Sequence, residues 1–123
     1  MKYEKLYEDF KSLFPEDNEY FVRLEEETGA DEDCGMHVVF GMVVSPYLIM
    51  VADENPLKAQ KAFVFVEQME ICGDEKIANV AEVSVLEVIM TDENGGMKKL
   101  GGFLGNESRK TVEHLAHYFK IDT

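Results

Sequence analysis

The sequence predicts an all-α domain of six or seven helices that stack as antiparallel hairpins, forming either an irregular bundle or a short α-solenoid. Apolar residues recur with helical spacing in most segments, and short turns rich in Gly, Pro, Asp and Asn separate these segments. With 123 residues and 46% hydrophobic composition, the chain is expected to form a single domain over residues 1–123. No internal sequence repeat distinguishes the bundle from the solenoid.

The N-terminal segment carries the clearest helical stripe. Its apolar residues recur at helical spacing on one face: Tyr3, Leu6, Tyr7, Phe10, Leu13 and Phe14. Pro15 is expected to end this helix, and Asp17 or Asn18 to cap a second helix that stops near Gly29. The acidic residues that follow are expected to lie in a solvated loop.

Residues 34–52 form a run of 19 residues without a formal charge, close to the length that crosses a bilayer. Two glycines, a histidine and Pro46 interrupt the run, and neither flank supplies a Lys or Arg that would orient a membrane span. We therefore predict no membrane span. The expected structure is a central core helix that breaks at Pro46, with Ser45 as the cap of its second half.

Two further helices are predicted on either side of Gly73. Asn55 begins the first, and Asp74 caps the second, which runs over residues 75–91. The second segment is rich in β-branched residues, but it is longer than an ordinary strand and its glutamates do not alternate with a period of two. The single hinge residue makes the pair a tight antiparallel hairpin.

The C-terminal segment is expected to form a last helix capped by Asn106. His114 and His117 lie three residues apart on it, a spacing that allows two imidazoles to share a metal. No further ligand lies nearby, and the order EHLAH differs from the HExxH order of zinc proteases. The sequence therefore predicts no metal site and no cofactor.

The charge of the chain excludes some partners. The formal net charge is −13, with 12 acids and 4 bases in residues 1–33, 10 and 3 in 34–93, and 3 and 5 in 94–123. Such a field repels phosphate backbones and anionic membranes, so nucleic-acid binding is not expected. A charged partner is expected to be a basic protein. The acidic patch predicted to meet it consists of Glu25, Glu26, Glu27, Asp31, Glu32 and Asp33.

Both cysteines lie in apolar stretches, so Cys34 and Cys72 are expected to be buried free thiols, which fits a reducing cytosol. The chain opens with an amphipathic helix instead of a secretory signal, so we expect a cytoplasmic protein. Cys34 and His37 have the spacing of a thiolate activated by an imidazole, but no third group orients the pair. A core histidine bonded to a carbonyl is the expected structure, and no catalytic residue is predicted.

Polar residues within the apolar helices are candidates for a polar core or a pocket. Asn79 and Glu87 are eight residues apart and fall on roughly one helical face. A buried carboxylate needs a base or several donors, so these two residues are expected to belong to an internal network that fixes the register of the hairpins. The alternative is a pocket in which Glu87 converges with His37 and Tyr47.

Two phrases, AFVFVEQMEICGDEKIANVAEVSVLEVI and LGGFLGNESRKTV, resemble small acidic bacterial helical proteins of uncharacterised function. Some proteins of this texture are immunity proteins of bacterial toxin systems. The resemblance implies an all-helical fold and a protein partner, and it transfers no catalytic residue.

Three functions are therefore weighed. The first is a non-enzymatic protein-binding domain, in the finer form a toxin-immunity protein whose acidic half meets a basic toxin such as a nuclease. The second is a small-ligand-binding protein or enzyme with a pocket between helical hairpins. The third is a scaffolding subunit. The sequence does not determine the oligomeric state.

Overall fold

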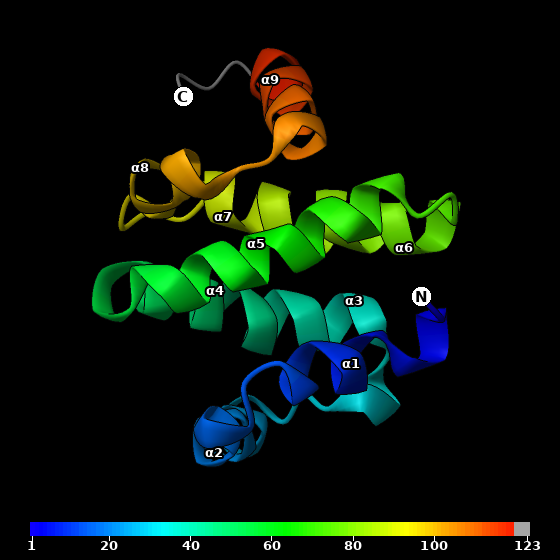
Figure 1. Cartoon of the computed structure of the whole chain (residues 1–123), viewed down its shortest axis with the longest axis vertical. Helices are drawn as coiled ribbons and strands as arrows, with labels where there is room; N and C mark the ends of the chain where they lie inside the picture. Colours follow the sequence, from blue (N-terminus) through cyan, green and yellow to red (C-terminus); the bar gives the residue numbers. More distant parts are fainter. Residues whose placement is uncertain (120–123) are drawn as a thin grey trace.

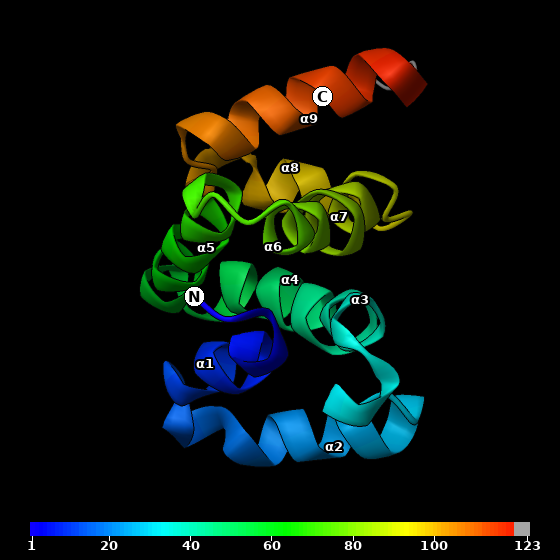
Figure 2. The ribbon, with the colours of Figure 1, turned by 90° about the vertical axis from the view of Figure 1, so that its right-hand side faces the viewer.

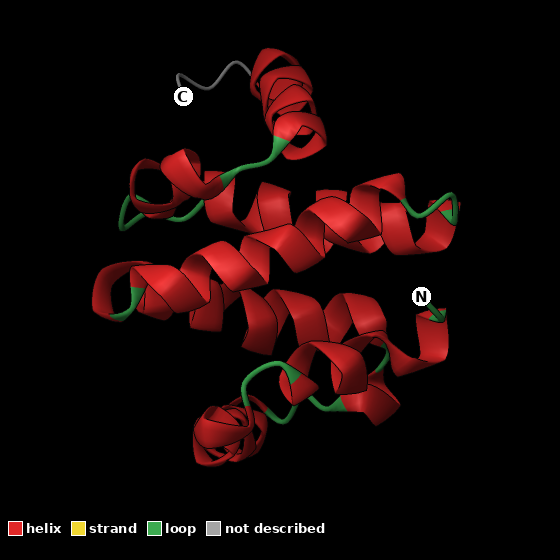
Figure 3. Ribbon diagram, in the orientation of Figure 1, coloured by secondary structure: helices red, strands yellow, loops and turns green. Residues whose placement is uncertain are grey.

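The computed structural model describes residues 1–119, and every regular element in that range is helical (Figure 3). The predicted all-α class is confirmed, and residues 120–123 of the predicted domain lie outside the described range. The α-helical segments are α1 (Leu6–Ser12), α2 (Asn18–Thr28), α3 (Met36–Val39), α4 (Ser45–Glu54), α5 (Pro56–Ile71), α6 (Glu75–Asn79), α7 (Val88–Met90), α8 (Gly96–Leu100) and α9 (Asn106–Phe119). Short 3-10 turns are η1 (Tyr3–Lys5), η2 (Pro15–Asp17), η3 (Glu32–Cys34) and η6 (Gly101–Phe103), and η4 (Phe40–Val44) and η5 (Val80–Glu87) are π-helical.

Two long helices are composites. The α3, η4 and α4 segments form one helix over Met36–Glu54, called here the 36–54 helix, and α6, η5 and α7 form the 75–90 helix. Between them α5 runs in the opposite direction, so the two composite helices run in the same direction behind it (Figure 1). The α2 helix lies across one end of this arrangement and α9 across the other (Figure 2).

The predicted hairpin around Gly73 is confirmed. Gly73 has a φ of 87°, a left-handed conformation that glycine adopts without steric cost. The Asp74 carboxylate accepts a hydrogen bond from the Lys76 amide at 2.9 Å and caps the second helix. The Asn55 side-chain oxygen caps α5 in the same way, accepting a hydrogen bond from the Lys58 amide at 3.2 Å.

The predicted helix break at Pro46 is wrong. The 36–54 helix continues through the proline, and the π-helical η4 segment lies directly before it. In a regular α-helix the proline ring would clash with the carbonyl of the preceding turn. Here the preceding turn is a π turn, which is wider than an α turn and leaves room for the ring. Ser45 is also not a cap, because its hydroxyl donates to the Ser84 carbonyl of the 75–90 helix at 2.7 Å.

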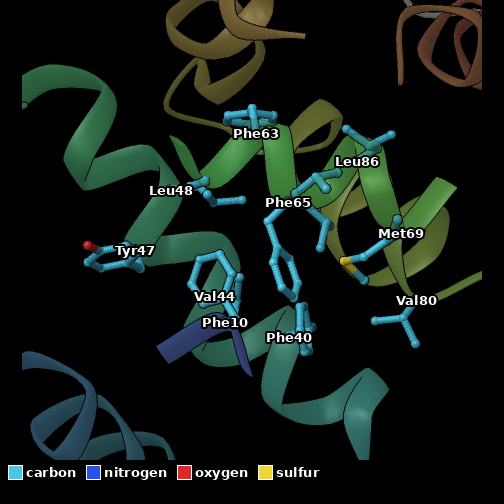
Figure 4. Packing of buried hydrophobic residues seen from close by; sticks show 14 of the residues in the cluster. Phe10, Phe40, Val44, Tyr47, Leu48, Phe63, Phe65, Met69, Val80 and Leu86 are labelled. Atoms are coloured by element: carbon cyan, nitrogen blue, oxygen red, sulfur yellow. The ribbon is translucent and has the colours of Figure 1, made fainter. Parts of the chain in front are cut away.

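One hydrophobic cluster fills the centre of the molecule, and aromatic rings dominate its N-terminal half. The Phe10 ring lies 6.0 Å from the Tyr47 ring and 5.4 Å from the Phe65 ring, which links α1 to both of the next layers (Figure 4). Edge-to-face contacts of this kind add about 0.5–1.5 kcal/mol each to the burial of the rings. The α1 and α2 segments are therefore part of the same core as the central helices.

By length and composition alone, Met36–Glu54 is apolar enough to cross a membrane. Half of its most apolar window is buried inside the protein, where Tyr47 and Leu48 are fully enclosed by neighbouring helices. A helix surrounded by other helices is apolar on most sides for that reason. The burial agrees with the core helix that the sequence predicts at this position.

Candidate interaction surface

The six residues of the predicted acidic patch have two different roles. Glu25 accepts a hydrogen bond from the Tyr7 hydroxyl at 3.0 Å and lies 3.8 Å from the Lys11 ammonium. Burial and the Glu25 charge together raise the pKa of Tyr7 well above its ordinary value, so the phenol remains a donor. Asp31 accepts from the Asp33 amide at 2.9 Å and caps η3. Glu25 and Asp31 therefore stabilise the fold locally.

The other four carboxylates are free to meet a partner. They are exposed, and within residues 1–119 their side chains form no hydrogen bond or ion pair: Glu26, Glu27, Glu32 and Asp33. The chain contains no Lys or Arg between Arg23 and Lys58, so no cation from this stretch neutralises them. Their negative potential is therefore available to solvent over about one Debye length, roughly 10 Å at 0.1 M salt.

The local geometry explains why these carboxylates gather at one corner. The α2 helix ends at Gly29, whose φ of 72° turns the chain back, as the sequence predicts. Three residues later η3 begins, and Gly35 at a φ of 101° directs the chain into α3. The acidic end of α2 and the acidic η3 turn therefore lie side by side at the lower right of Figure 2.

A polar contact joins the two composite helices, but residues other than the predicted Asn79 and Glu87 form it. His37 Nδ1 and Ser84 Oγ share a hydrogen bond of 2.7 Å, and Ser45 Oγ donates to the Ser84 carbonyl at the same distance. Ser45 and Ser84 are buried, so these bonds fix the register of two otherwise apolar helices. His37 is half-buried and bonds a hydroxyl instead of the expected carbonyl.

Asn79 and Glu87 do not form the predicted internal network. Asn79 is exposed at the rim of an open hollow of about 460 Å³, which it lines with Glu75, Lys76, Ala78 and Glu82. Glu87 is half-buried, and within the described residues its carboxylate has no hydrogen bond or ion pair. The π-helical η5 segment changes the angle between successive residues, so the α-helical face that the sequence spacing implied does not hold.

Tyr47 lies in a second polar contact, far from His37. Its buried hydroxyl donates to Asp17 Oδ2 at 2.6 Å, and the Lys58 ammonium donates to the same oxygen at 2.8 Å. Burial opposes ionisation of Asp17, but the bonds from Lys58 and Tyr47 hold its pKa below the ordinary value. Ten residues of helix separate Tyr47 from His37, about 15 Å along the axis. These two predicted pocket residues therefore do not converge.

The prediction of buried cysteines is wrong. Cys34 and Cys72 are both exposed free thiols. Cys34 ends the η3 turn before Gly35, and Cys72 follows the last residue of α5, so each lies at a chain reversal outside the apolar face of its helix. Cys34 and His37 are in different elements, and their spacing in the sequence does not place them on one helical face.

The histidines of α9 lie on its surface. His114 and His117 are both exposed, and His114 lines a hollow of about 230 Å³ with Glu82, Lys110, Thr111 and Leu115. Within residues 1–119, no group of three or more His, Cys, Asp or Glu side chains has the arrangement of a metal site. The described side chains of α9 therefore present a mixed polar surface.

One family model matches the chain. It carries the description "Domain of unknown function (DUF7674)" and matches residues 7–119, which extend from α1 to the end of α9. The chain belongs to the DUF7674 family. No curated protein and no solved structure matches it. Membership of DUF7674 therefore agrees with the resemblance to uncharacterised proteins, while the resemblance to immunity proteins stays a prediction.

Sequence reasoning missed two glutamates of α5 that attach α9 to α5 within this DUF7674 domain. Glu67 of α5 accepts hydrogen bonds from the Glu107 amide at 2.8 Å and from the Ser108 amide at 3.0 Å. Burial opposes its ionisation, but these bonds lower its pKa. The positive end of the α9 dipole favours a carboxylate at this point. Asn106 was expected to cap the helix, and instead Glu67, 40 positions before Glu107, does so.

Glu70 lies one helical turn further along α5 and is the least satisfied carboxylate of this region. Its Oε2 accepts from the Thr111 hydroxyl at 3.2 Å, while its Oε1 is buried and has no hydrogen-bond partner among the described residues. Burial, followed by the charge of Glu82, raises its pKa to about 7. No local sequence signal marks Glu67 or Glu70, because both depend on the packing of α9 against α5.

Proposed function

We propose that this chain is a non-enzymatic protein-binding domain whose acidic side meets a basic protein. The observation that carries the proposal is the group of four exposed carboxylates at the end of α2 and in η3 that have no partner within residues 1–119: Glu26, Glu27, Glu32 and Asp33. A protein usually places bases among its surface acids, and the complete absence of Lys and Arg between Arg23 and Lys58 leaves a field of one sign. Such a field accelerates the encounter with a partner of opposite charge.

The finer form of the proposal is a toxin-immunity protein. The resemblance of the 62–89 phrase to small acidic helical bacterial proteins supports this form, as does the expected preference for a basic toxin. A nuclease toxin is basic because it must bind a phosphate backbone, so an acidic partner can compete for the same surface. The same charge disfavours nucleic acid as a direct ligand of this chain.

A pocket-based function has less support. It requires His37, Tyr47 and Glu87 to meet at one concave site, and the first two belong to separate hydrogen-bonded pairs. The Tyr47 side chain is fully buried and its hydroxyl is already bonded, so it cannot contact a ligand without a rearrangement. We therefore rank a ligand-binding or enzymatic function, and a purely scaffolding one, below protein binding.

A capture experiment tests the proposal. The full chain is immobilised and exposed to lysate of the source cell at low and at high salt, beside a variant with Glu26→Gln, Glu27→Gln, Glu32→Gln and Asp33→Asn. The matched control carries Glu8→Gln, Asp9→Asn, Glu19→Gln and Glu113→Gln, which are exposed acids elsewhere and give the same change in charge. We expect a basic protein that binds the wild type and the control at low salt and is lost from the first variant. Equal capture by both variants would contradict the proposed surface.

A further inference from the structure

The outer side of the two composite helices is unusually apolar for a protein surface. Over residues 36–50 the exposed side chains are Val38 and Met42, with 40% and 45% of their surface accessible. Over residues 77–90 the exposed ones are Val83, Val88 and Asn79. The charged side chains on these two stretches are Glu82 and Glu87, and both are half-buried, although 30% of the chain is charged. Exposed apolar side chains that occur together mark an interaction site more often than single ones do.

These side chains belong to one continuous strip. A Cβ at Gly41 would lie 3.8 Å from the Ser84 carbonyl oxygen and 4.0 Å from Val88 Cγ2, so the two helices are in close contact at this glycine. Val38 and Met42 are one turn apart on the outer side of the first helix, and Val83 precedes the buried Ser84 on the second. The strip therefore extends across the seam between two parallel helices.

The register of the two helices is fixed at this strip. His37 and Ser45, one turn before and one turn after Gly41, both bond to Ser84. The π-helical segments η4 and η5 contain Gly41 and Ser84 and lie against each other. Single π-helical turns are frequent at functional sites, because they displace side chains from the regular helical pattern. The strip is consequently a rigid surface, which costs little entropy on binding.

The charge around the strip determines which occupant fits it. No Lys or Arg occurs in residues 24–57 or in residues 77–97, which together include η3 and both composite helices except the start of α6. Glu87 is half-buried beside Val88, and the exposed acids of η3 and of the end of α2 lie at one edge. Figure 2 shows the end of α2 and the two composite helices on the same side of the molecule. An apolar strip that has acids at its edge, in stretches of the sequence without Lys or Arg, fits a partner that is apolar in the middle and basic at its sides.

We infer that this strip is the docking site for an amphipathic helix of a basic partner, with the apolar face of that helix on Val38, Met42, Val83 and Val88. The inference rests on the proposed function and names the surface and the kind of segment that the partner supplies. A second copy of this chain is a poor occupant, because each copy carries a net charge of −13 and its own strip lies in stretches without Lys or Arg. An anionic membrane is disfavoured for the same reason.

Peptide binding tests the inference directly. The probe is a 14-residue peptide of Leu and Lys arranged as an amphipathic helix, and its control has the same composition scrambled so that no apolar stripe forms. Binding is followed by amide chemical shifts of the full chain labelled with 15N. We expect the amphipathic peptide to shift amides of residues 36–50 and 77–90 and to bind at least tenfold more tightly than the scrambled one.

Surface variants locate the site. Met42→Lys and Val83→Lys introduce a cation on the strip, and each is expected to weaken binding at least tenfold. The matched control is Val64→Lys, because Val64 of α5 is 53% exposed in the layer on the other side of the composite helices (Figure 1). It adds the same charge and is expected to change the affinity by less than twofold. Far-ultraviolet circular dichroism checks that all three variants fold.

Each other result has a distinct meaning. If the scrambled peptide binds equally well and shifts only α2 and η3, the helix-docking site is refuted while a basic partner remains supported. If neither peptide binds, both the docking site and the proposed function are contradicted. If Val64→Lys weakens binding as much as Met42→Lys does, the strip is not the site.

Two other occupants of the strip would overturn the inference. If light scattering shows a dimer and Met42→Lys dissociates it, a second copy covers the strip. If the chain binds preferentially to phosphatidylglycerol vesicles, a membrane covers it.

Discussion

Glu70 is the side chain expected to make the stability of this protein depend on pH near neutrality. Burial and the neighbouring charge of Glu82 raise the pKa of Glu70 from 4.5 to about 7. The charges of Glu67 and Glu107 raise this pKa further, while the hydrogen bond from Thr111 lowers it. Between these two pH values the folded protein keeps a proton that the unfolded chain has lost. The free energy of unfolding is therefore expected to fall as the pH rises from about 4.5 to 7, and this group adds no further change above that range.

The size of the effect follows from the pKa difference. At about 1.4 kcal/mol per pKa unit, the full difference corresponds to about 3.5 kcal/mol. Glu70 is only partly buried, so solvent screening reduces the expected contribution to about 1–2 kcal/mol. Glu70→Gln removes the titrating group and keeps the shape of the side chain, and it is expected to remove that part of the pH dependence.

Urea unfolding at pH 5 and pH 8 measures the difference. The wild type is expected to lose about 1–2 kcal/mol more than Glu70→Gln between the two pH values. Glu93→Gln, at an exposed position, serves as the control and is expected to follow the wild type. Identical pH dependence in the wild type and Glu70→Gln would refute the assignment of the raised pKa to this partly buried carboxyl, whose Oε1 has no partner among the described residues.

Three further predictions concern the contacts that hold the helices together. Glu67→Ala removes the carboxylate at the start of α9 and is expected to cost about 2–3 kcal/mol, with faster hydrogen exchange confined to α9; slow exchange there would contradict the capping role. Gly105→Ala would place a Cβ 2.5 Å from Glu67 Cδ and is expected to lower the melting temperature, whereas Gly102→Ala has no atom within 4 Å and serves as the control. Tyr47→Phe removes a buried hydrogen bond and is expected to cost about 1 kcal/mol in urea unfolding, and an unchanged midpoint would exclude that contribution.

The parts of the fold that the sequence predicts correctly depend on local signals. The α5–α6 hairpin is one example, since Asn55, Gly73 and Asp74 each favour the same structure as the apolar spacing around them. The left-handed Gly29 at the end of α2 is another. A cap or a turn is determined by a few neighbouring residues, so its signal is present in the sequence.

The parts that were missed depend on contacts between distant residues. Pro46 predicts a helix break locally, but the π-helical turn before it and the bond from Ser45 to Ser84 keep the helix continuous. Asp17 has the sequence of a helix cap, yet its carboxylate bonds Tyr47 and Lys58 instead. The cysteines lie in apolar stretches of the sequence, but each is at the end of its element, beside Gly35 or Gly73, where the adjoining residues are exposed as well.

The candidate surface shows the same division. Composition and charge spacing predicted the acidic group at residues 25–33, but the structure assigns Glu25 and Asp31 to internal contacts and leaves four carboxylates for a partner. The apolar strip had no sequence signal of its own. Val38 and Met42 lie in a run that is apolar throughout, so only the packing of the neighbouring helices distinguishes the two exposed side chains from the buried ones.

Crosslinking inside the source cell tests the central claim, that a basic protein binds the side formed by the composite helices. A photo-reactive phenylalanine is placed at Met42, at Val83 and, as a control, at Val64, and the crosslinked proteins are identified by mass spectrometry. We predict one basic protein attached at Met42 and at Val83 and absent at Val64, with a crosslinked peptide that is amphipathic and rich in Lys or Arg. Crosslinks of equal yield at Val64, or an acidic partner at Met42, would contradict the claim.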